Sequence, residues 1–214
     1  MMLPEHGLYA ITDSRNLTTA ELIAKTALIL QSGANMLQYR NKTDNLHNRE
    51  YQALQLQQLC HDYSVPFIIN DDLKLAQKIN ADGIHLGRDD QTCEIARKIL
   101  GPECIIGISC YNKIKLALAA ELSGATYIAF GAFFPTTSKP DTSVATTALL
   151  SQARQQLNLP IVAIGGITPE NGKKLVQAGA DFLAVISGIY EAPDPALATR
   201  AFLNLFNSKQ EQYD

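Results

Sequence analysis

Charged and amide side chains follow one short apolar run of the sequence at alternate positions. Gln38, Arg40 and Lys42 come at and just after the run Met36 to Arg40. Successive side chains of a β-strand point to opposite faces, so these three share one face. An Arg fork and a Lys charge at a strand end suit phosphate oxygens, although such pairs also form surface salt bridges. The spacing favours a phosphorylated substrate.

Acidic residues follow the next two apolar runs, in the stretches 70–72 and 85–90. Carboxylates from neighbouring strand ends suit Mg²⁺, which takes a few carboxylates together with water and phosphate oxygens. The alternative is helix capping by Asp72, Asp89 or Asp90. As a set facing the basic cluster, the acids favour a metal site. His85 lies within an apolar run, where a His is more often a packing residue than a ligand, so it is assigned no role.

Hydroxyls and glycines follow the later apolar runs. Ser109 ends one run, and three hydroxyl residues with Lys139 follow another: Thr136, Thr137 and Ser138. This donor-rich loop suits phosphate, although it is equally typical of a solvated loop. The stretches 165–171 and 186–188 then supply glycines and Thr168-Pro169, a helix start. These two stretches follow the last two of the eight apolar runs described below. In (β/α)₈ barrels the loops after strands 7 and 8 often hold phosphate, which makes this the more specific signal.

Eight apolar runs alternate with stretches of helical spacing. The runs are 7–12, 36–40, 66–70, 83–86, 105–109, 127–131, 160–164 and 182–186. Continuous apolar runs bounded by turn residues are typical of parallel strands buried on both faces. Eight strand–helix units predict an α/β fold, a single (β/α)₈ TIM barrel over residues 1–207 with a polar tail at 208–214. An open doubly wound sheet is the alternative.

Glycines lie at the boundaries between the predicted helices and the strands that follow them. Gly33, Gly83, Gly124 and Gly179 each follow a helical stretch and precede or begin the next strand. A glycine just past a helix end can adopt the left-handed conformation that reverses the chain, so we expect that role at all four.

Composition excludes several classes of protein. The chain has 214 residues, 46% hydrophobic and 18% charged, with net charge −3. This balance argues against partners such as nucleic acid or an anionic membrane, and the apolar runs are too short to span a bilayer. The four cysteines lack metal or redox spacing, which predicts reduced thiols in a cytoplasmic protein. The sequence leaves a homo-oligomer open.

Together the motifs resemble the thiamine phosphate synthase family. The matching stretches are 8–13, 38–42, 69–72, 81–87, 107–109, 134–139, 163–167 and 185–187, nearly the whole chain in order. The resemblance implies an Mg²⁺-dependent enzyme that joins hydroxymethylpyrimidine diphosphate to thiazole phosphate and releases pyrophosphate. Its partners are then small phosphorylated substrates.

The resemblance also implies roles for individual residues. The pyrimidine diphosphate would be held by Gln38, Tyr39, Arg40, Asn41, Lys42, Asn70, Ser109 and Lys139, and Mg²⁺ by Asp71 and Asp90. The thiazole phosphate would be held by Thr136, Thr137, Ser138, Gly166, Ile186 and Ser187. Arg40, Lys42 and Lys139 would be catalytic, because they can stabilise the charge of the departing pyrophosphate.

The sequence departs from the family pattern at a few positions. Arg88 stands where the family has Gln, Ala132 where it has Pro, and Ser138 where it has Thr. A glycine usual near Thr147 is missing. The sister branch, which aromatises a thiazole carboxylate phosphate, tends to lose the metal acids and has His at the position of Tyr111. It is therefore the weaker alternative, as is a non-catalytic barrel that binds phosphate or thiazole.

Overall fold

The eight apolar runs form a closed ring of parallel strands. The computed structural model describes residues 1–15, 17–42, 46–135 and 144–207. The strands are β1 Gly7–Ile11, β2 Met36–Tyr39, β3 Phe67–Asn70, β4 Gly83–Leu86, β5 Ile105–Tyr111, β6 Tyr127–Phe130, β7 Ile161–Ile164 and β8 Phe182–Val185. Each pairs with its neighbour in sequence, and β8 pairs with β1. The predicted (β/α)₈ barrel is confirmed, and the open sheet is excluded.

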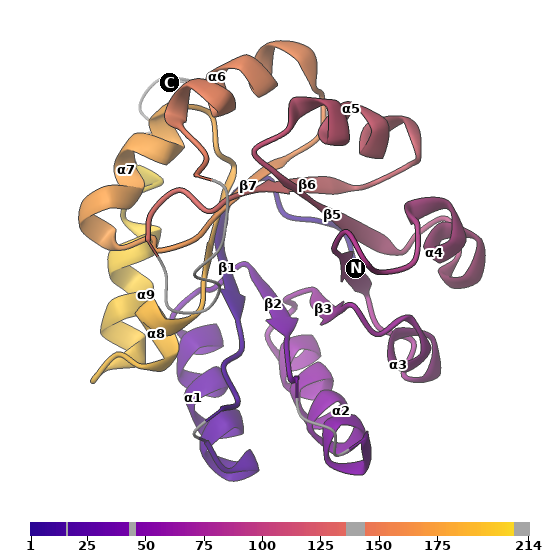
Figure 1. Cartoon of the computed structure of the whole chain (residues 1–214). Helices are drawn as coiled ribbons and strands as arrows, with labels where there is room; N and C mark the ends of the chain where they lie inside the picture. The colour runs from indigo at the N-terminus through magenta and orange to yellow at the C-terminus, as the bar shows by residue number, and fades with distance from the viewer. Residues whose placement is uncertain (16, 43–45, 136–143, 208–214) are drawn as a thin grey trace.

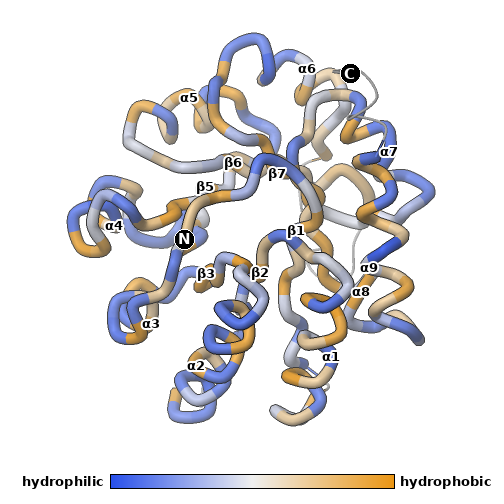
Figure 2. Tube along the Cα trace, turned by 180° about the vertical axis from the view of Figure 1, so that it is seen from behind, coloured by the Kyte–Doolittle hydropathy of each residue, from blue (hydrophilic) through white to orange (hydrophobic). Residues whose placement is uncertain are grey.

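Helices cover the outside of the strand ring (Figure 1). Their bounds are α1 Thr19–Gln31, α2 Leu46–Asp62, α3 Leu73–Lys78, α4 Cys93–Leu100, α5 Ile114–Leu122, α6 Thr147–Gln156, α7 Pro169–Gln177, α8 Ser187–Tyr190 and α9 Pro195–Leu203. Apolar and polar residues alternate along α1 and α2 in Figure 2. The apolar side faces the strands: Leu22 and Ile29 of α1 are fully buried. Burial of each such side chain is worth about 1.5–3 kcal/mol.

Two apolar cores follow from the period-two alternation of the strands. One lies between strands and helices. The other fills the barrel interior and is made of Tyr9, Ile11, Met36, Ile68, Ile105, Tyr127, Ala129, Val162, Phe182 and Ala184. Some interior positions towards the strand ends carry small side chains, such as Ala129 and Ala184. They leave space at that end of the barrel.

Three of the four predicted glycine turns are confirmed, and the fourth is wrong. Gly33, Gly124 and Gly179 have φ of 101°, 83° and 112°. At the remaining turn the left-handed residue is Asn80, with φ 52°. Gly83 has another role, because a Cβ there would lie 2.4 Å from the carbonyl oxygen of Ile105. This glycine permits the close approach of β4 and β5.

Two further features concern the cysteines and the lengths of the helices. Cys60, Cys93, Cys104 and Cys110 are all unpaired. Across the described part of the chain, every helix is too short or too polar to cross a membrane.

Candidate active site

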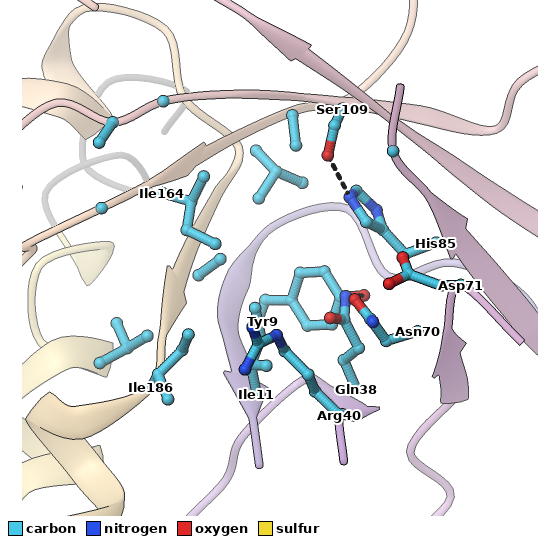
Figure 3. Close-up of a pocket in the computed structure, with 18 of the residues that line it drawn as sticks. Tyr9, Ile11, Gln38, Arg40, Asn70, Asp71, His85, Ser109, Ile164 and Ile186 are labelled. Carbon is cyan, nitrogen blue, oxygen red and sulfur yellow. Dashed lines mark hydrogen bonds between the residues drawn. The ribbon is translucent and has the colours of Figure 1, made fainter. Parts of the chain in front are cut away.

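A cavity of about 360 Å³ opens at the carboxyl ends of the strands. Its polar and apolar residues lie on different sides (Figure 3). Asn70, Asp71, His85 and Ser109 lie to the right in this view, whereas Ile164 and Ile186 lie to the left. The cavity therefore has one wall for charged or hydrogen-bonding groups and one for apolar rings.

The predicted basic face of β2 lines this cavity. Gln38, Arg40 and Lys42 all border it, as their alternate spacing predicts. The buried Thr12 fixes the end of the strand: its hydroxyl accepts a hydrogen bond from the Arg40 N–H (2.8 Å) and donates to the Arg40 carbonyl oxygen (3.2 Å). The Lys42 ammonium forms an ion pair with the Asp71 carboxylate. Two cations from one strand thus border the same cavity.

Tyr39 and Asn41 lie on the other face of β2, outside the cavity lining. The Tyr39 hydroxyl donates to the Gln52 side chain of α2 (2.7 Å), and its ring stacks on Phe67. The Asn41 side chain donates to the same Gln52 oxygen (3.0 Å). The structure thus does not bring these two predicted substrate contacts to the site, because strand alternation turns them towards the helices.

Asp71 and Asp90 meet at the cavity edge. Asp71 follows β3 with φ 63°, and its carboxyl group and that of Asp90 lie close enough to shift each other's pKa. The Asp90 carboxylate also accepts a hydrogen bond from the Gly87 N–H (2.6 Å). Burial raises the pKa of Asp71, but the Lys42 ammonium and the Asp90 side chain outweigh it and hold that pKa below its usual value. Burial and the Asp71 carboxylate raise the pKa of Asp90.

The acid pair has the chemistry of a magnesium site with few protein ligands. Over the described residues, no three His, Cys, Asp or Glu side chains cluster as a closed metal site requires. Mg²⁺ usually binds through one or two carboxylates, with waters and substrate phosphates completing its shell. The two adjacent carboxylates, open to the cavity, fit such an ion.

Of the two neighbouring acids, Asp72 caps a helix and Asp89 lines the cavity. Asp72 is the N-cap of α3: its carboxylate accepts from the Leu75 N–H (3.0 Å) and pairs with Arg49 (2.6 Å). Asp89 borders the cavity. Thr92 caps α4, so the alternative that Asp89 or Asp90 caps this helix is wrong.

His85, to which the sequence assigned no role, lines the cavity. Its Nε2 lies 2.8 Å from the Ser109 Oγ (Figure 3), and its Nδ1 lies 3.0 Å from the Tyr127 hydroxyl. Sequence reasoning also did not single out Tyr9 as a cavity residue. The alternation that places Gln38 inside applies equally to Tyr9, His85 and Ser109, and would have indicated their orientation.

The glycine loop after β7 borders the cavity opposite the acids. Gly165 and Gly166 have φ of 105° and 60°, and both line the cavity, as do Ile186 and Ser187 after β8. A Cβ on Gly166 would lie 2.3 Å from the carbonyl oxygen of Pro135. Only glycine fits this backbone at that distance. Thr168 is the N-cap of α7 and Pro169 its first residue, as expected.

Several predicted residues lie outside the described residues. These are Thr136, Thr137, Ser138 and Lys139. Thr147, near which the family pattern has a glycine, is the first residue of α6.

A closed parallel barrel with a polar cavity at the carboxyl ends of its strands is the architecture of a (β/α)₈-barrel enzyme. The family model described as thiamine monophosphate synthase matches residues 8–189. The chain therefore belongs to the thiamine monophosphate synthase family, and it is a transferase.

Similar proteins cover nearly the whole chain. It is 50% identical over 202 residues to a thiamine-phosphate synthase from Nitrosococcus oceani, covering 94% of this chain and 93% of that one. It is 45% identical to one from Thiobacillus denitrificans, covering 96% and 97%. The structure of thiamine phosphate pyrophosphorylase from Pyrococcus furiosus superposes with a TM-score of 0.86 at 32% identity, covering 95% and 96%.

Proposed function

We propose that this enzyme transfers the pyrimidinylmethyl group of 4-amino-5-hydroxymethyl-2-methylpyrimidine diphosphate, through its methylene carbon, to the ring nitrogen of thiazole phosphate. The products are thiamine phosphate and pyrophosphate, and the reaction depends on Mg²⁺. The family membership supports the type of reaction. The observation that carries the proposal is that Arg40, Lys42, Asp71 and Asp90 border one cavity with the Gly165-Gly166 loop across it.

The two sides of the cavity suit two different phosphorylated ligands. The side with Arg40 and Lys42 provides cations, as a diphosphate requires. The glycine side provides backbone N–H groups, which suit a monophosphate. A shared cavity holds both ligands close together and in a fixed orientation. The two substrates then react without first having to meet in solution, which lowers the entropic cost of the reaction.

The reaction needs stabilisation of negative charge more than it needs a base. The bond between the pyrimidine methylene carbon and the diphosphate oxygen breaks, and its electron pair leaves with the pyrophosphate. The lone pair of the thiazole nitrogen then forms the new carbon–nitrogen bond. No proton is removed in either step. Arg40 and Lys42 therefore act on the leaving group, where charge develops.

Asp71 and Asp90 would hold the magnesium ion. Bound there, Mg²⁺ supplies neutralisation of diphosphate oxygens. The Lys42 ammonium forms an ion pair with Asp71, so it lies beside the proposed ion and within the same part of the cavity as the diphosphate. Lys139, which lies outside the described residues, is proposed to contribute a third cation.

The apolar side orients the rings of the two substrates. Ile164 and Ile186 line this side of the cavity, and Ile11 lines it next to Tyr9 and Arg40 (Figure 3). These side chains would exclude water from the methylene carbon at which one bond breaks and the other forms. Exclusion of water strengthens the interactions of the cations and prevents hydrolysis of the activated pyrimidine.

Pyrophosphate release tests the proposal directly. Phosphorus NMR of the purified chain with both substrates and Mg²⁺ is expected to show pyrophosphate and thiamine phosphate in equal amounts. Omission of Mg²⁺ or of thiazole phosphate is expected to abolish thiamine phosphate. Conversion of a thiazole carboxylate phosphate with no coupling product would instead indicate the tautomerase activity of the sister branch. Binding without turnover would indicate a non-catalytic barrel.

A further inference from the structure

A continuous chain of hydrogen bonds runs along the wall of the cavity and through the barrel interior, and joins Gln38 to Ser109. The Gln38 Nε2 donates to the Tyr9 hydroxyl (2.7 Å), which lies 2.7 Å from the Tyr127 hydroxyl. That hydroxyl lies 3.0 Å from the His85 Nδ1, and the His85 Nε2 lies 2.8 Å from the Ser109 Oγ (Figure 3). Two side chains predicted to bind the pyrimidine are thus connected through three residues with no assigned role.

Tyr9 and Tyr127, in the middle of the hydrogen-bond chain, are held rigidly. Tyr9 and Tyr127 are 1% and 0% exposed, and their rings meet edge to face with centroids 5.8 Å apart. The His85 ring stacks on Tyr127 with centroids 5.6 Å apart. Gly107 makes room for the phenol, because a Cβ at this position would lie 2.0 Å from the Tyr127 Cζ. These contacts leave the two phenols little freedom to choose other partners.

The amide at one end sets the direction of every proton in the chain. Gln38 donates to Tyr9. With that bond in place, the one arrangement that gives each phenol proton an acceptor directs the Tyr9 proton to Tyr127 and the Tyr127 proton to the His85 Nδ1, at contacts of 2.7 and 3.0 Å. Burial raises the pKa of both phenols, so each keeps the proton that it donates. A ring that accepts at Nδ1 carries its proton on Nε2 and donates it to Ser109.

We propose that Tyr127 and His85 are positioning residues that orient the Ser109 hydroxyl as a hydrogen-bond donor to the pyrimidine substrate. The Ser109 oxygen accepts from His85, which leaves its proton free to enter the cavity. Ser109 therefore selects a ligand atom that carries a lone pair and disfavours an N–H or O–H group at that point. The identity of the ligand rests on the proposed function. The donor-to-acceptor direction of the hydrogen bonds from Gln38 to Ser109 does not depend on it.

The tautomer of His85 tests the direction without any substrate. In the protein with ¹⁵N-labelled histidine, the ring signals lost in His85→Gln identify this residue among the four histidines. We expect an Nδ1 that carries no proton and accepts from Tyr127, and an Nε2 that carries the proton donated to Ser109. Tyr127→Phe, which removes the donor to Nδ1, is expected to produce a mixture of tautomers. A wild-type ring with its proton on Nδ1 would overturn the proposal.

A double-mutant cycle tests whether Tyr127 affects binding of the pyrimidine diphosphate through Ser109. Ser109→Ala is expected to raise the KM for the pyrimidine diphosphate about tenfold, the effect of one lost hydrogen bond, with the KM for thiazole phosphate unchanged. Tyr127→Phe alone is expected to raise the same KM about fivefold. In the Ser109→Ala background it is expected to add less than about twofold, because the hydroxyl that it orients is gone.

Two outcomes separate positioning from general loosening of the barrel. If the effects of Tyr127→Phe and Ser109→Ala multiply, Tyr127 does not act through Ser109 and the proposal is wrong. Tyr190→Phe is the matched control: it removes another fully buried phenol hydroxyl, bonded to Thr26 at 2.9 Å, and is expected to keep the wild-type KM. A wild-type protein that forms no pyrophosphate would contradict the proposed function, while the tautomer would still report the direction of the chain.

Discussion

The guanidinium carbon of Arg88 lies 4.6 Å from the centre of the Tyr111 ring at the edge of the cavity. The Arg88 N–H also donates to the Tyr111 hydroxyl (3.3 Å). Tyr111 has φ 56° at the irregular end of β5, where the register with β6 shifts. The pair connects this end of β5 to the loop after β4 that carries Asp90. It also keeps a positive charge at the cavity edge, at a position where the family resemblance led us to expect an uncharged Gln.

Arg88→Gln is expected to raise the KM for the pyrimidine diphosphate about fivefold at low salt. The side chain is exposed, so it acts on the anionic substrate mainly through long-range attraction, which salt screens. Steady-state kinetics at low and high salt measure the effect. Arg88→Lys is the control, since it keeps the charge and loses the planar stacking surface. A deficit in Arg88→Gln that is independent of salt would contradict an electrostatic role.

Asp71→Asn and Asp90→Asn are each expected to lower kcat/KM at limiting Mg²⁺ about a hundredfold, because each removes a carboxylate from the proposed ion. Asn suits position 71 because it tolerates the φ of 63° there. Titration of pyrophosphate release with Mg²⁺ is the measurement.

Asp72→Asn controls for the charge removed from this loop. The Asp72 carboxylate caps α3 and pairs with Arg49, and Asn preserves the cap. Its Mg²⁺ dependence is expected to stay within about twofold of the wild type. If Asp71→Asn and Asp90→Asn behave like Asp72→Asn at limiting Mg²⁺, the two acids do not hold the metal.

The sequence predicts the barrel well because parallel strands buried on both faces leave a direct pattern of apolar runs. The exact role of a single glycine is harder to predict. Gly83 follows a helical stretch as Gly33 does, yet Asn80 already makes the left-handed turn. What requires glycine at position 83 is the carbonyl oxygen of Ile105, and this contact across the sheet is absent from the local sequence.

For the site, alternation predicts which face a side chain occupies but not what it contacts. It correctly groups Gln38, Arg40 and Lys42, whereas the family motif, taken as one continuous stretch, also includes Tyr39 and Asn41, which face α2. The sequence did not indicate the hydrogen bonds of His85, because its partners are distant in sequence. Its two ring partners lie 24 and 42 residues further along the chain and meet it only when the barrel closes.

Gly107→Ala is expected to destabilise the fold by about 1–3 kcal/mol and to disrupt the hydrogen-bond chain, because the new methyl group overlaps the Tyr127 ring. Denaturant unfolding measures the first effect, and the KM for the pyrimidine diphosphate the second. Gly124→Ala is the control. It has φ 83° with no atom within 4 Å of the new Cβ, so it costs about 1–2 kcal/mol from backbone strain alone and is expected to leave KM unchanged. An unchanged KM in Gly107→Ala would contradict the role of Tyr127.

Gly166→Ala is expected to raise the KM for thiazole phosphate about tenfold and to affect the pyrimidine diphosphate far less. The added Cβ would lie 2.3 Å from the carbonyl oxygen of Pro135 and 2.9 Å from the Phe134 Cβ, so the loop after β7 must move away from its neighbour. Movement of backbone N–H groups by even a fraction of an ångström weakens their hydrogen bonds to a phosphate. Kinetics with one substrate varied and the other saturating separate the two KM values.

Gly101→Ala controls for the backbone strain in Gly166→Ala. Gly101 follows α4 with φ 89°, and a Cβ there meets no atom within 4 Å. With ψ 173° as well, Gly101 has a backbone conformation that is essentially restricted to glycine, so the substitution imposes backbone strain without displacing a loop at the cavity. It is expected to lower stability and leave both KM values unchanged. If Gly166→Ala raises both KM values equally, the glycine loop positions the whole cavity and not one phosphate, and the assignment of separate sides for the two substrates is wrong.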